Sequence, residues 1–288
     1  MKTRVVSGLL MLPLLVLIAI GGEVINLMCF LIALIGVREF YNAFKHKDVK
    51  PSMTIASVCV FLLFIVPGHI AAYTQRAGDS FAFIVMWVML VMILSMLYMF
   101  NIKERKLEDG IVTAFGLIYV AFFAYHVVLL DTLSRQIFHS DLFSFHIAGH
   151  AYSIVGPYSI VWLVIFCAFG TDVFAYFTGY LFGKHKLCKT ISPKKTVEGA
   201  VGGVIGATVL CSAYAYIFMR EYIVYVVIMA VAGSIFSQLG DLSASIFKRK
   251  LEIKDYGDLI PGHGGVLDRF DSVLFAAPFM YYLAYILW

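Results

Sequence analysis

The chain has 288 residues, of which 61% are hydrophobic and 14% charged, and its mean hydropathy is +0.90. This composition excludes a soluble globular domain, because long apolar runs recur along the whole length. The net charge of +4 sits in short connections beside apolar runs, which suits anionic lipid headgroups and argues against binding of nucleic acid. We therefore expect an all-α, polytopic integral membrane protein.

Nine apolar segments are expected to span the membrane. Lys2 and Arg4 precede the first, as in a signal peptide, but no site of small residues with a polar start follows, so we expect this segment to be retained. The nine segments are 5–22, 24–40, 54–72, 81–100, 111–131, 158–183, 197–218, 222–247 and 271–287.

The distribution of Lys and Arg predicts the orientation. With nine spans, 19 of the 22 Lys and Arg residues fall on the side of the N-terminus. Because positively charged loops stay in the cytoplasm, we expect the N-terminus inside and the C-terminus outside. The connections after segments six and eight then face the cytosol.

The five cysteines contain no closely spaced pair, and four lie in apolar segments. We therefore expect small buried hydrophobes rather than disulfides or metal ligands. They are Cys29, Cys59, Cys167, Cys188 and Cys211.

The longest connection on the outer side, at about 132–157, is rich in histidine. His146 and His150 stand at helical i, i+4 spacing, and His139 and Asp141 precede them. A metal site is one interpretation, but we favour an interfacial helix with solvated histidines.

The chain divides at about residue 155. Residues 1–155 are mostly plain apolar helix, whereas polar residues enter the membrane segments of residues 156–288. One face of segment six carries Asp172, Tyr176, Gly179 and Gly183 at i, i+4, i+7 and i+11. Segment seven has four small residues that let helices approach closely, namely Gly199, Gly202, Gly203 and Gly206.

Segment eight has a polar stripe about 21 Å long at 1.5 Å per residue. The stripe consists of Ser234, Gln238, Asp241, Ser245 and Lys248. Because an Asp within the membrane costs roughly 2.5–3.5 kcal/mol, Asp241 is expected to face a cavity, a partner or an ion. For Asp241 and Asp172 alike, a carboxylate hydrogen-bonded between helices is the simpler alternative.

Three cytosolic elements are expected to meet: the polar stripe, the basic run 192–199 and the sequence 261–271. Carboxylates are the oxygen ligands that Mg²⁺ prefers. Lysines, hydroxyls and helix-start N–H groups hold phosphate oxygens, and glycines around His263 permit close approach to a ligand. Together they predict a phosphate-and-metal site. Taken singly, the basic run could be a charged flank in which Thr196 caps a helix. Pro261 to Gly265 could be only a turn, and Asp268 to Asp271 only a solvated helix start.

Residues 245–271 resemble the signature of the phosphatidate cytidylyltransferases, also called CDP-diacylglycerol synthases. The matching residues are Ser245-Ile246-Phe247-Lys248-Arg249, Lys254-Asp255, Gly257 and Pro261-Gly262-His263-Gly264-Gly265-Val266-Leu267-Asp268-Arg269-Phe270-Asp271. Gly240-Asp241, the run from Ser192 to Gly199 and Asp172 are also similar to the family's pattern. The N-terminal half is similar only in consisting of apolar helices.

The resemblance implies transfer of a cytidylyl group from CTP to phosphatidate, giving CDP-diacylglycerol and pyrophosphate in phospholipid biosynthesis. The site would face the cytosol from a bacterial cytoplasmic membrane, with residues 156–288 as the catalytic region and 1–155 as a lipid-facing scaffold. A homodimer, a second metal and a monovalent cation are left open.

Roles follow from the resemblance as hypotheses. Asp241 and Asp268 would hold Mg²⁺, with Asp271 as a further candidate ligand. The groups expected to hold CTP phosphates are Ser192, Lys194, Lys195 and Thr196. Lys248 and Arg269 would neutralise phosphatidate or pyrophosphate, and His263 would donate a hydrogen bond to phosphate. Asp172, Glu198 and Asp255 are second-tier candidates.

Two alternatives remain. A CTP-dependent polyprenol or dolichol kinase would have a similar CTP site, although the full match over 245–271 argues against it. An ion-coupled transporter would use Asp172 and Asp241 as cation ligands, but the paired internal repeats common in transporters are not evident in the sequence.

Overall fold

Membrane-length helices dominate the computed structural model, which describes residues 12–74, 79–138, 143–147, 150–154, 156–260, 262 and 264–288. Within these residues, seven helices are long and apolar enough to cross a membrane, and Met53–Pro67 is the apolar first part of a further helix. The expectation of a mainly helical integral membrane protein is confirmed. The count of nine spans stays a prediction, since the first segment lies partly outside the described residues.

The N-terminal half is a series of helices: α2 (Leu12–Ile20), α3 (Glu23–Phe44), the 3-10 turn η1 (Lys45–Lys47), α4 (Met53–Thr74) and α5 (Asp79–Tyr98). One long helix then runs from Leu107 to Phe138. Its parts are α6 (Leu107–Gly116), the π-helical segment η2 (Leu117–Phe122) and α7 (Phe123–Phe138).

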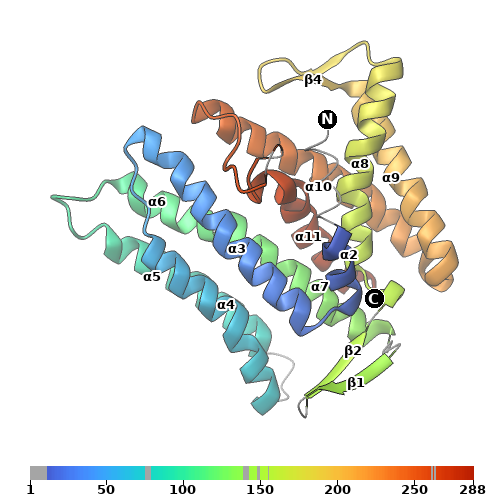
Figure 1. The fold of residues 1–288 in the computed structure, drawn as a ribbon, viewed down its shortest axis with the longest axis horizontal. Helices are drawn as coiled ribbons and strands as arrows, with labels where there is room; N and C mark the ends of the chain where they lie inside the picture. The colour runs from blue at the N-terminus through green and yellow to red at the C-terminus, as the bar shows by residue number, and fades with distance from the viewer. Residues whose placement is uncertain are drawn as a thin grey trace.

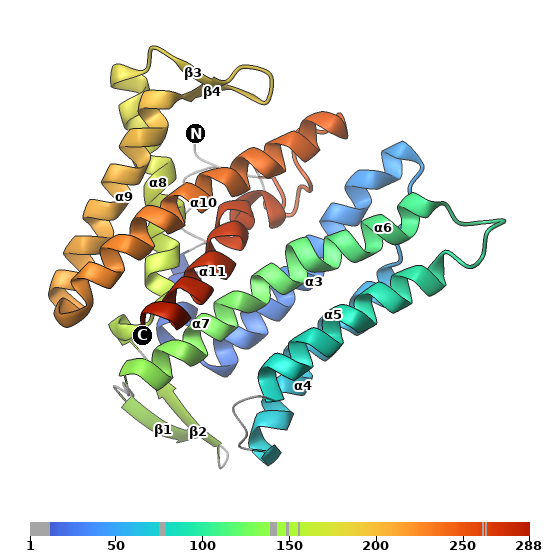
Figure 2. The ribbon, with the colours of Figure 1, turned by 180° about the vertical axis from the view of Figure 1, so that it is seen from behind.

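The C-terminal half contains α8 (Val161–Phe182), the strands β3 (Lys186–Cys188) and β4 (Ser192–Thr196), α9 (Val197–Phe218), α10 (Ile223–Lys250) and α11 (Leu267–Leu287). The 3-10 turns η3 (Gly156–Tyr158) and η4 (Arg220–Tyr222) precede α8 and α10. Helices α8 and α9 form a pair, and α10 and α11 lie between this pair and α7 (Figure 1, Figure 2). The β3–β4 hairpin stands at one end of the bundle and the C-terminus at the other (Figure 1).

Aromatic side chains join the two halves around Phe40, which is fully buried. Its ring centroid lies 5.6 Å from those of Tyr119 and Phe247 and 6.2 Å from that of Tyr256. Such tilted and edge-to-face pairs add to the free energy of apolar burial. They fix α3 against η2, α10 and the loop 251–266 that follows α10.

Glycine allows α8 and α9 to pack at short range. A Cβ at Gly199 would lie 2.8 Å from the carbonyl oxygen of Ala175, and one at Gly203 would lie 2.9 Å from that of Thr171. Because these opposing atoms belong to the main chain, no rotamer change makes room for a larger residue. The role predicted for the glycines of this helix is confirmed.

The connection after α7 contains a β-hairpin, so the interfacial helix predicted there is wrong. Strand β1 (Phe143–Ile147) pairs antiparallel with β2 (His150–Ile154). His146 and His150 therefore lie on different strands, and helical spacing does not apply. The sequence Phe-Ser-Phe-His-Ile of β1 alternates apolar and polar residues, which is the period of a strand. Two other residues of this connection, His139 and Asp141, lie outside the described residues.

Helix α11 begins four residues before the predicted boundary, at Leu267 rather than 271. Asp268 and Asp271 therefore belong to its first turns, where both are buried. The alternative of a solvated helix start is thereby excluded for these two carboxylates.

The cysteines supply a test of the orientation. All five are free, and Cys188 on β3 is partly exposed whereas the other four are buried. A membrane-impermeant maleimide should label Cys188 in inside-out vesicles and not in intact cells, because the charged connections are expected to be cytoplasmic. A Cys188→Ser variant should not be labelled from either side. Labelling of the native protein in intact cells would reverse the predicted orientation.

Candidate functional site

The carboxylate of Asp268 closes the loop 251–266. Its Oδ1 accepts a hydrogen bond from Lys248 Nζ at 2.9 Å, and its Oδ2 accepts from the backbone N–H groups of Tyr256 (2.8 Å) and Gly265 (3.0 Å). The side chain is only 2% exposed. Three of its roughly four acceptor positions are thus filled by protein donors. The geometry favours a structural role, and metal ligation by Asp268 stays a prediction.

A second carboxylate, from the N-terminal half, holds the start of α11. Glu39 of α3 is 7% exposed. Its Oε1 accepts from the N–H of Val266 at 3.0 Å and its Oε2 from that of Leu267 at 2.8 Å. These are N–H groups that a helix start cannot satisfy within the helix, and the partial positive charge there favours an anion.

Glu39 explains two glycines of the signature. A Cβ at Gly265 would lie 2.5 Å from Glu39 Oε2, and one at Gly257 would lie 2.6 Å from Oε1. Glu39 was not among the predicted site residues, which all lie in the C-terminal half. An acidic residue inside segment 24–40 was the available signal, since a carboxylate in an apolar helix requires a partner.

The basic run and the polar stripe meet through an ion pair. Lys195 of β4 is paired with Asp241 of α10, and the two side chains are 28% and 26% exposed. Ser245 Oγ lies 3.5 Å from Asp241 Oδ1, and Gln238 Nε2 donates to the carbonyl oxygen of Ala200 at 3.2 Å. The predicted convergence of these two elements is therefore present in the fold.

Two further carboxylates lie near Asp241. Asp172 of α8 and Asp271 of α11 each interact electrostatically with Asp241. Asp271 is buried and accepts from the N–H of Ser272 at 2.7 Å. Asp172 is exposed, and its carboxylate has no hydrogen bond to another described residue. Carboxylates on three helices thus lie within electrostatic range of one another.

Two polar atoms beside these carboxylates have no partner within the described part of the chain. They are Nε of Arg269 and the hydroxyl of Tyr119, and both are buried. Arg269 interacts electrostatically with Asp172, and Tyr119 does so with Asp241, Asp268 and Asp271. An unmatched buried donor is costly, so Arg269 suits an anionic ligand. Tyr119 lies in the π-helical segment η2, a kind of distortion frequent at functional sites. It was not among the predicted site residues.

A cavity of about 470 Å³ opens beside the Lys195–Asp241 pair. It lies between α8, the β3–β4 hairpin, the start of α9 and Gln238 of α10. All four residues predicted to share one face of segment six line it, as do three of the residues predicted to hold phosphate: Asp172, Tyr176, Gly179, Gly183, Lys194, Lys195 and Thr196. Thr196 also caps α9, since its Oγ1 accepts from the N–H of Gly199 at 3.1 Å.

Other predicted site residues lie elsewhere. Ser192 pairs with Cys188 across the hairpin and does not line the cavity. Glu198 accepts from the N–H groups of Lys184 (3.1 Å) and His185 (3.2 Å), so it secures the end of α8. Asp255 is exposed, and His263 lies outside the described residues.

The donor set fits a hard cation only in part. Within the described residues, no group of three or more His, Cys, Asp or Glu side chains stands ready to hold an ion. Mg²⁺ commonly takes one or two protein carboxylates and completes its shell with water and substrate phosphate. Asp241 and its neighbour Asp271 match that requirement in chemistry, and Asp172 offers a further free carboxylate.

Comparison with known proteins agrees with this geometry. The model of the cytidylyltransferase family matches residues 2–287. The chain therefore belongs to the cytidylyltransferase family.

Curated relatives with the name phosphatidate cytidylyltransferase share about three residues in ten with this chain. The one from Staphylococcus haemolyticus is 31% identical, and those from Staphylococcus epidermidis and Staphylococcus aureus are 30% identical. Each comparison covers 96% of this chain and 95% of the relative. The resemblance drawn from residues 245–271 is confirmed, and it extends over both halves.

Glu39 gives a direct test of how the loop is held. Glu39→Gln replaces one carboxylate oxygen by an amide nitrogen, which cannot accept from an N–H group, so one of the hydrogen bonds from Val266 and Leu267 is lost at a cost of about 1–3 kcal/mol. We expect a lower melting temperature and faster tryptic cleavage at Lys254 in the purified protein. Glu23→Gln, at the other end of the same helix, is the matched control because Glu23 is exposed. Equal cleavage of both variants would contradict this role.

Proposed function

We propose that this chain transfers the cytidylyl group of CTP to phosphatidate, giving CDP-diacylglycerol and pyrophosphate. The observation that carries the proposal is the pairing of Lys195, from the basic β3–β4 hairpin, with Asp241 of α10, beside a cavity that Asp172 and Lys194 also line, in a member of the cytidylyltransferase family. The names of the relatives support phosphatidate as the lipid substrate.

CTP is proposed to occupy the cavity with its phosphates toward the hairpin. Lys194, Lys195 and the first N–H groups of α9 present positive charge there. Tyr176 and Tyr180 line the same cavity and are exposed. They offer ring faces against which a pyrimidine base can stack.

Lys195 is the group through which nucleotide binding would reach the carboxylates. It is paired with Asp241, and a CTP phosphate would compete for its ammonium group. Transfer of Lys195 to the phosphate would leave Asp241 available to a divalent cation. Binding of nucleotide and of cation would then be linked, because each removes a competitor of the other.

The lipid phosphate is proposed to approach from the α11 side. Arg269 has an unmatched buried Nε there, whereas Lys248 is engaged with Asp268. A phosphatidate oxygen would attack the α-phosphorus of CTP, forming one P–O bond while the bond to the bridging oxygen of pyrophosphate breaks. The attacking phosphate is already anionic and needs no general base, so positioning and charge neutralisation would supply most of the rate.

Mg²⁺ bound by Asp241 and Asp271 would neutralise phosphate charge at the site. The carboxylates are proposed to face the cytosol in a bacterial cytoplasmic membrane, because the charged connections gather at the end of the bundle that carries them. CTP would then arrive from the cytosol and phosphatidate from the bilayer.

The reaction can be followed with labelled CTP. Purified protein should convert CTP and phosphatidate to a labelled lipid and release pyrophosphate, and omission of the lipid or of the divalent cation should abolish both products. Transport of a solute without consumption of CTP would support a transporter. A phosphorylated lipid together with CDP would instead identify a kinase.

Replacement of Asp241 and replacement of Asp268 by Asn should have different effects. Asp241→Asn should lower the rate roughly 10²-fold or more, which corresponds to about 3 kcal/mol of lost electrostatic stabilisation, with little change in melting temperature because its ion pair is partly exposed. Asp268→Asn should lower the melting temperature as well, because a buried ion pair loses one partner.

Glu108→Gln is the control, since Glu108 is exposed and belongs to α6, which lies apart from the β3–β4 hairpin (Figure 1). Activity and thermal unfolding measured on the same preparations separate the two effects. Wild-type activity and Mg²⁺ dependence in a folded Asp241→Asn variant would remove Asp241 from the site.

A further inference from the structure

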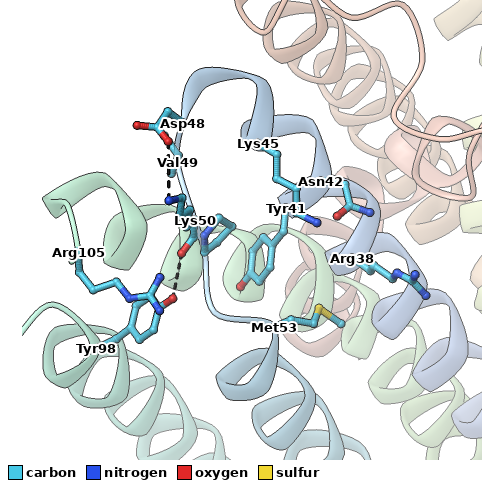
Figure 3. Close-up of a pocket in the computed structure, with 11 residues that line it drawn as sticks. Arg38, Tyr41, Asn42, Lys45, Asp48, Val49, Lys50, Met53, Tyr98 and Arg105 are labelled. Carbon is cyan, nitrogen blue, oxygen red and sulfur yellow. Dashed lines mark hydrogen bonds and ion pairs between the residues drawn. The ribbon is translucent and has the colours of Figure 1, made fainter. Parts of the chain in front are cut away.

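A second cavity, of about 500 Å³, lies in the N-terminal half (Figure 3). Its walls are the end of α3, the connection 45–52, the start of α4, the end of α5 and Arg105 before α6. None of the residues assigned above to the reaction lines it. It nevertheless lies at the same end of the bundle as the loop 251–266, because Lys47 is paired with Glu252 of that loop at 2.7 Å.

Positive charge surrounds this cavity. Arg38 and Lys45 extend from α3 and η1, with Arg105 and Lys50 on the other walls (Figure 3). Arg38 and Lys45 are exposed, and neither side chain has an ion pair or hydrogen bond to another described residue. Positions 38, 42 and 45 follow the i, i+4, i+7 spacing of one helix face, which adds the amide of Asn42 as a hydrogen-bond donor.

The acidic residue in the lining, Asp48, does not cancel this charge. Its carboxylate is held by Lys106 at 2.5 Å, with Lys50 at 4.0 Å. The hydrogen bond from Lys106 lowers the pKa of the Asp48 carboxyl. Asp48 is thus committed to a lysine outside the cavity, and the cations that face the cavity remain in excess.

The cavity is built from a fixed main chain. The N–H of Lys50 donates to Asp109 Oδ1 at 2.7 Å, and that of Ser52 donates to Thr113 Oγ1 at 2.9 Å. Tyr98 donates its hydroxyl to the carbonyl oxygen of Lys50 at 3.0 Å (Figure 3). A site whose walls are held in this way loses little conformational entropy when it binds a ligand.

One wall combines this charge with rings. The Arg105 guanidinium lies 4.5 Å from the centroid of the Tyr98 ring, which orients it without neutralising it. Tyr41 and Met53 add apolar surface beneath the cations (Figure 3). Cations above an apolar wall, at the ends of membrane helices, are suited to a phosphate that is attached to an apolar or glycerol moiety.

We propose that this cavity binds the phosphate group of an anionic ligand, a phospholipid headgroup or a soluble phosphate ester, at a site separate from the reaction site. Arg38 and Lys45 would contact the phosphate directly, and Arg105 would complete the charge around it. Since α3 also carries Glu39, a ligand here would stabilise the helix that holds the start of α11. The inference does not depend on the proposed reaction.

The test compares binding of phosphatidylglycerol and phosphatidylcholine to the full-length protein. Neither lipid is a substrate in the proposed reaction, and only the first carries net negative charge. Native mass spectrometry should show phosphatidylglycerol retained by the wild type and bound roughly 10- to 30-fold more weakly by the double variant Arg38→Gln, Lys45→Gln. Phosphatidylcholine should bind both proteins alike.

The matched control is Lys103→Gln, Lys189→Gln, which removes two exposed cations that line neither cavity. A second arm adds inorganic phosphate or glycerol phosphate and measures the melting temperature. If these compounds raise the melting temperature of the wild type but not of the Arg38 and Lys45 variant, and the two proteins bind lipid alike, the site is assigned to a soluble phosphate ester. Equal responses of wild type and this variant in both arms would overturn the proposal, and Lys45→Gln alone provides the same comparison should the double variant not fold.

Discussion

The hydrogen bonds of Asp268 determine how the rest of the site is arranged. In the described part of the loop 251–266, Ile260 and Gly264 form an isolated bridge, and side chains satisfy several of the other main-chain groups. Asp268 accepts from two of its N–H groups and from Lys248 at the end of α10. One carboxylate therefore sets both the path of the loop and the position of a polar-stripe lysine. A buried charge satisfied by several donors stabilises one arrangement strongly, because loss of any partner leaves the others uncompensated.

On the other side of the site, the main chain sets the geometry. Glycines of α9 pack against carbonyl oxygens of α8. Thr196 caps α9 where the hairpin ends. Lys195 directly precedes Thr196, so the rigid packing of α8 against α9 fixes its position. In the proposed reaction, Lys195 would exchange partners between Asp241 and a phosphate without movement of the helices.

Much of the C-terminal half could be predicted from its sequence, because the polar residues there have the helical period and the membrane makes each one costly. The face of segment six lines the cavity, and the stripe of segment eight meets β4 and α11. The hairpin β1–β2 was missed because the spacing of two histidines four residues apart indicated a helix, although Phe143–Ile147 alternates apolar and polar residues over five positions. In short segments both periods compete, and pairing with a neighbour decides.

The sequence alone does not show which distant segments contact each other. Glu39 and Tyr119 lie in helices whose patterns are plainly apolar, and their importance arises from what packs against them. The early start of α11 has the same cause, since the Glu39 carboxylate satisfies N–H groups that otherwise disfavour a helix start. No periodicity within residues 261–271 contains that information.

The pairing of Glu39 with the start of α11 also has a consequence for biogenesis. Glu39 is separated from its two partners by 227 and 228 residues, and at roughly 5–20 residues per second the ribosome needs about 10 to 45 s to reach them. During that interval α3 carries a carboxylate whose partners do not yet exist. Its place near the end of the helix allows water or headgroups to solvate it while the later helices are inserted. The loop 251–266 can therefore reach its final structure only after α11 has been synthesised. In a chain truncated before α11, Glu39 would have no partner and the loop would not be held.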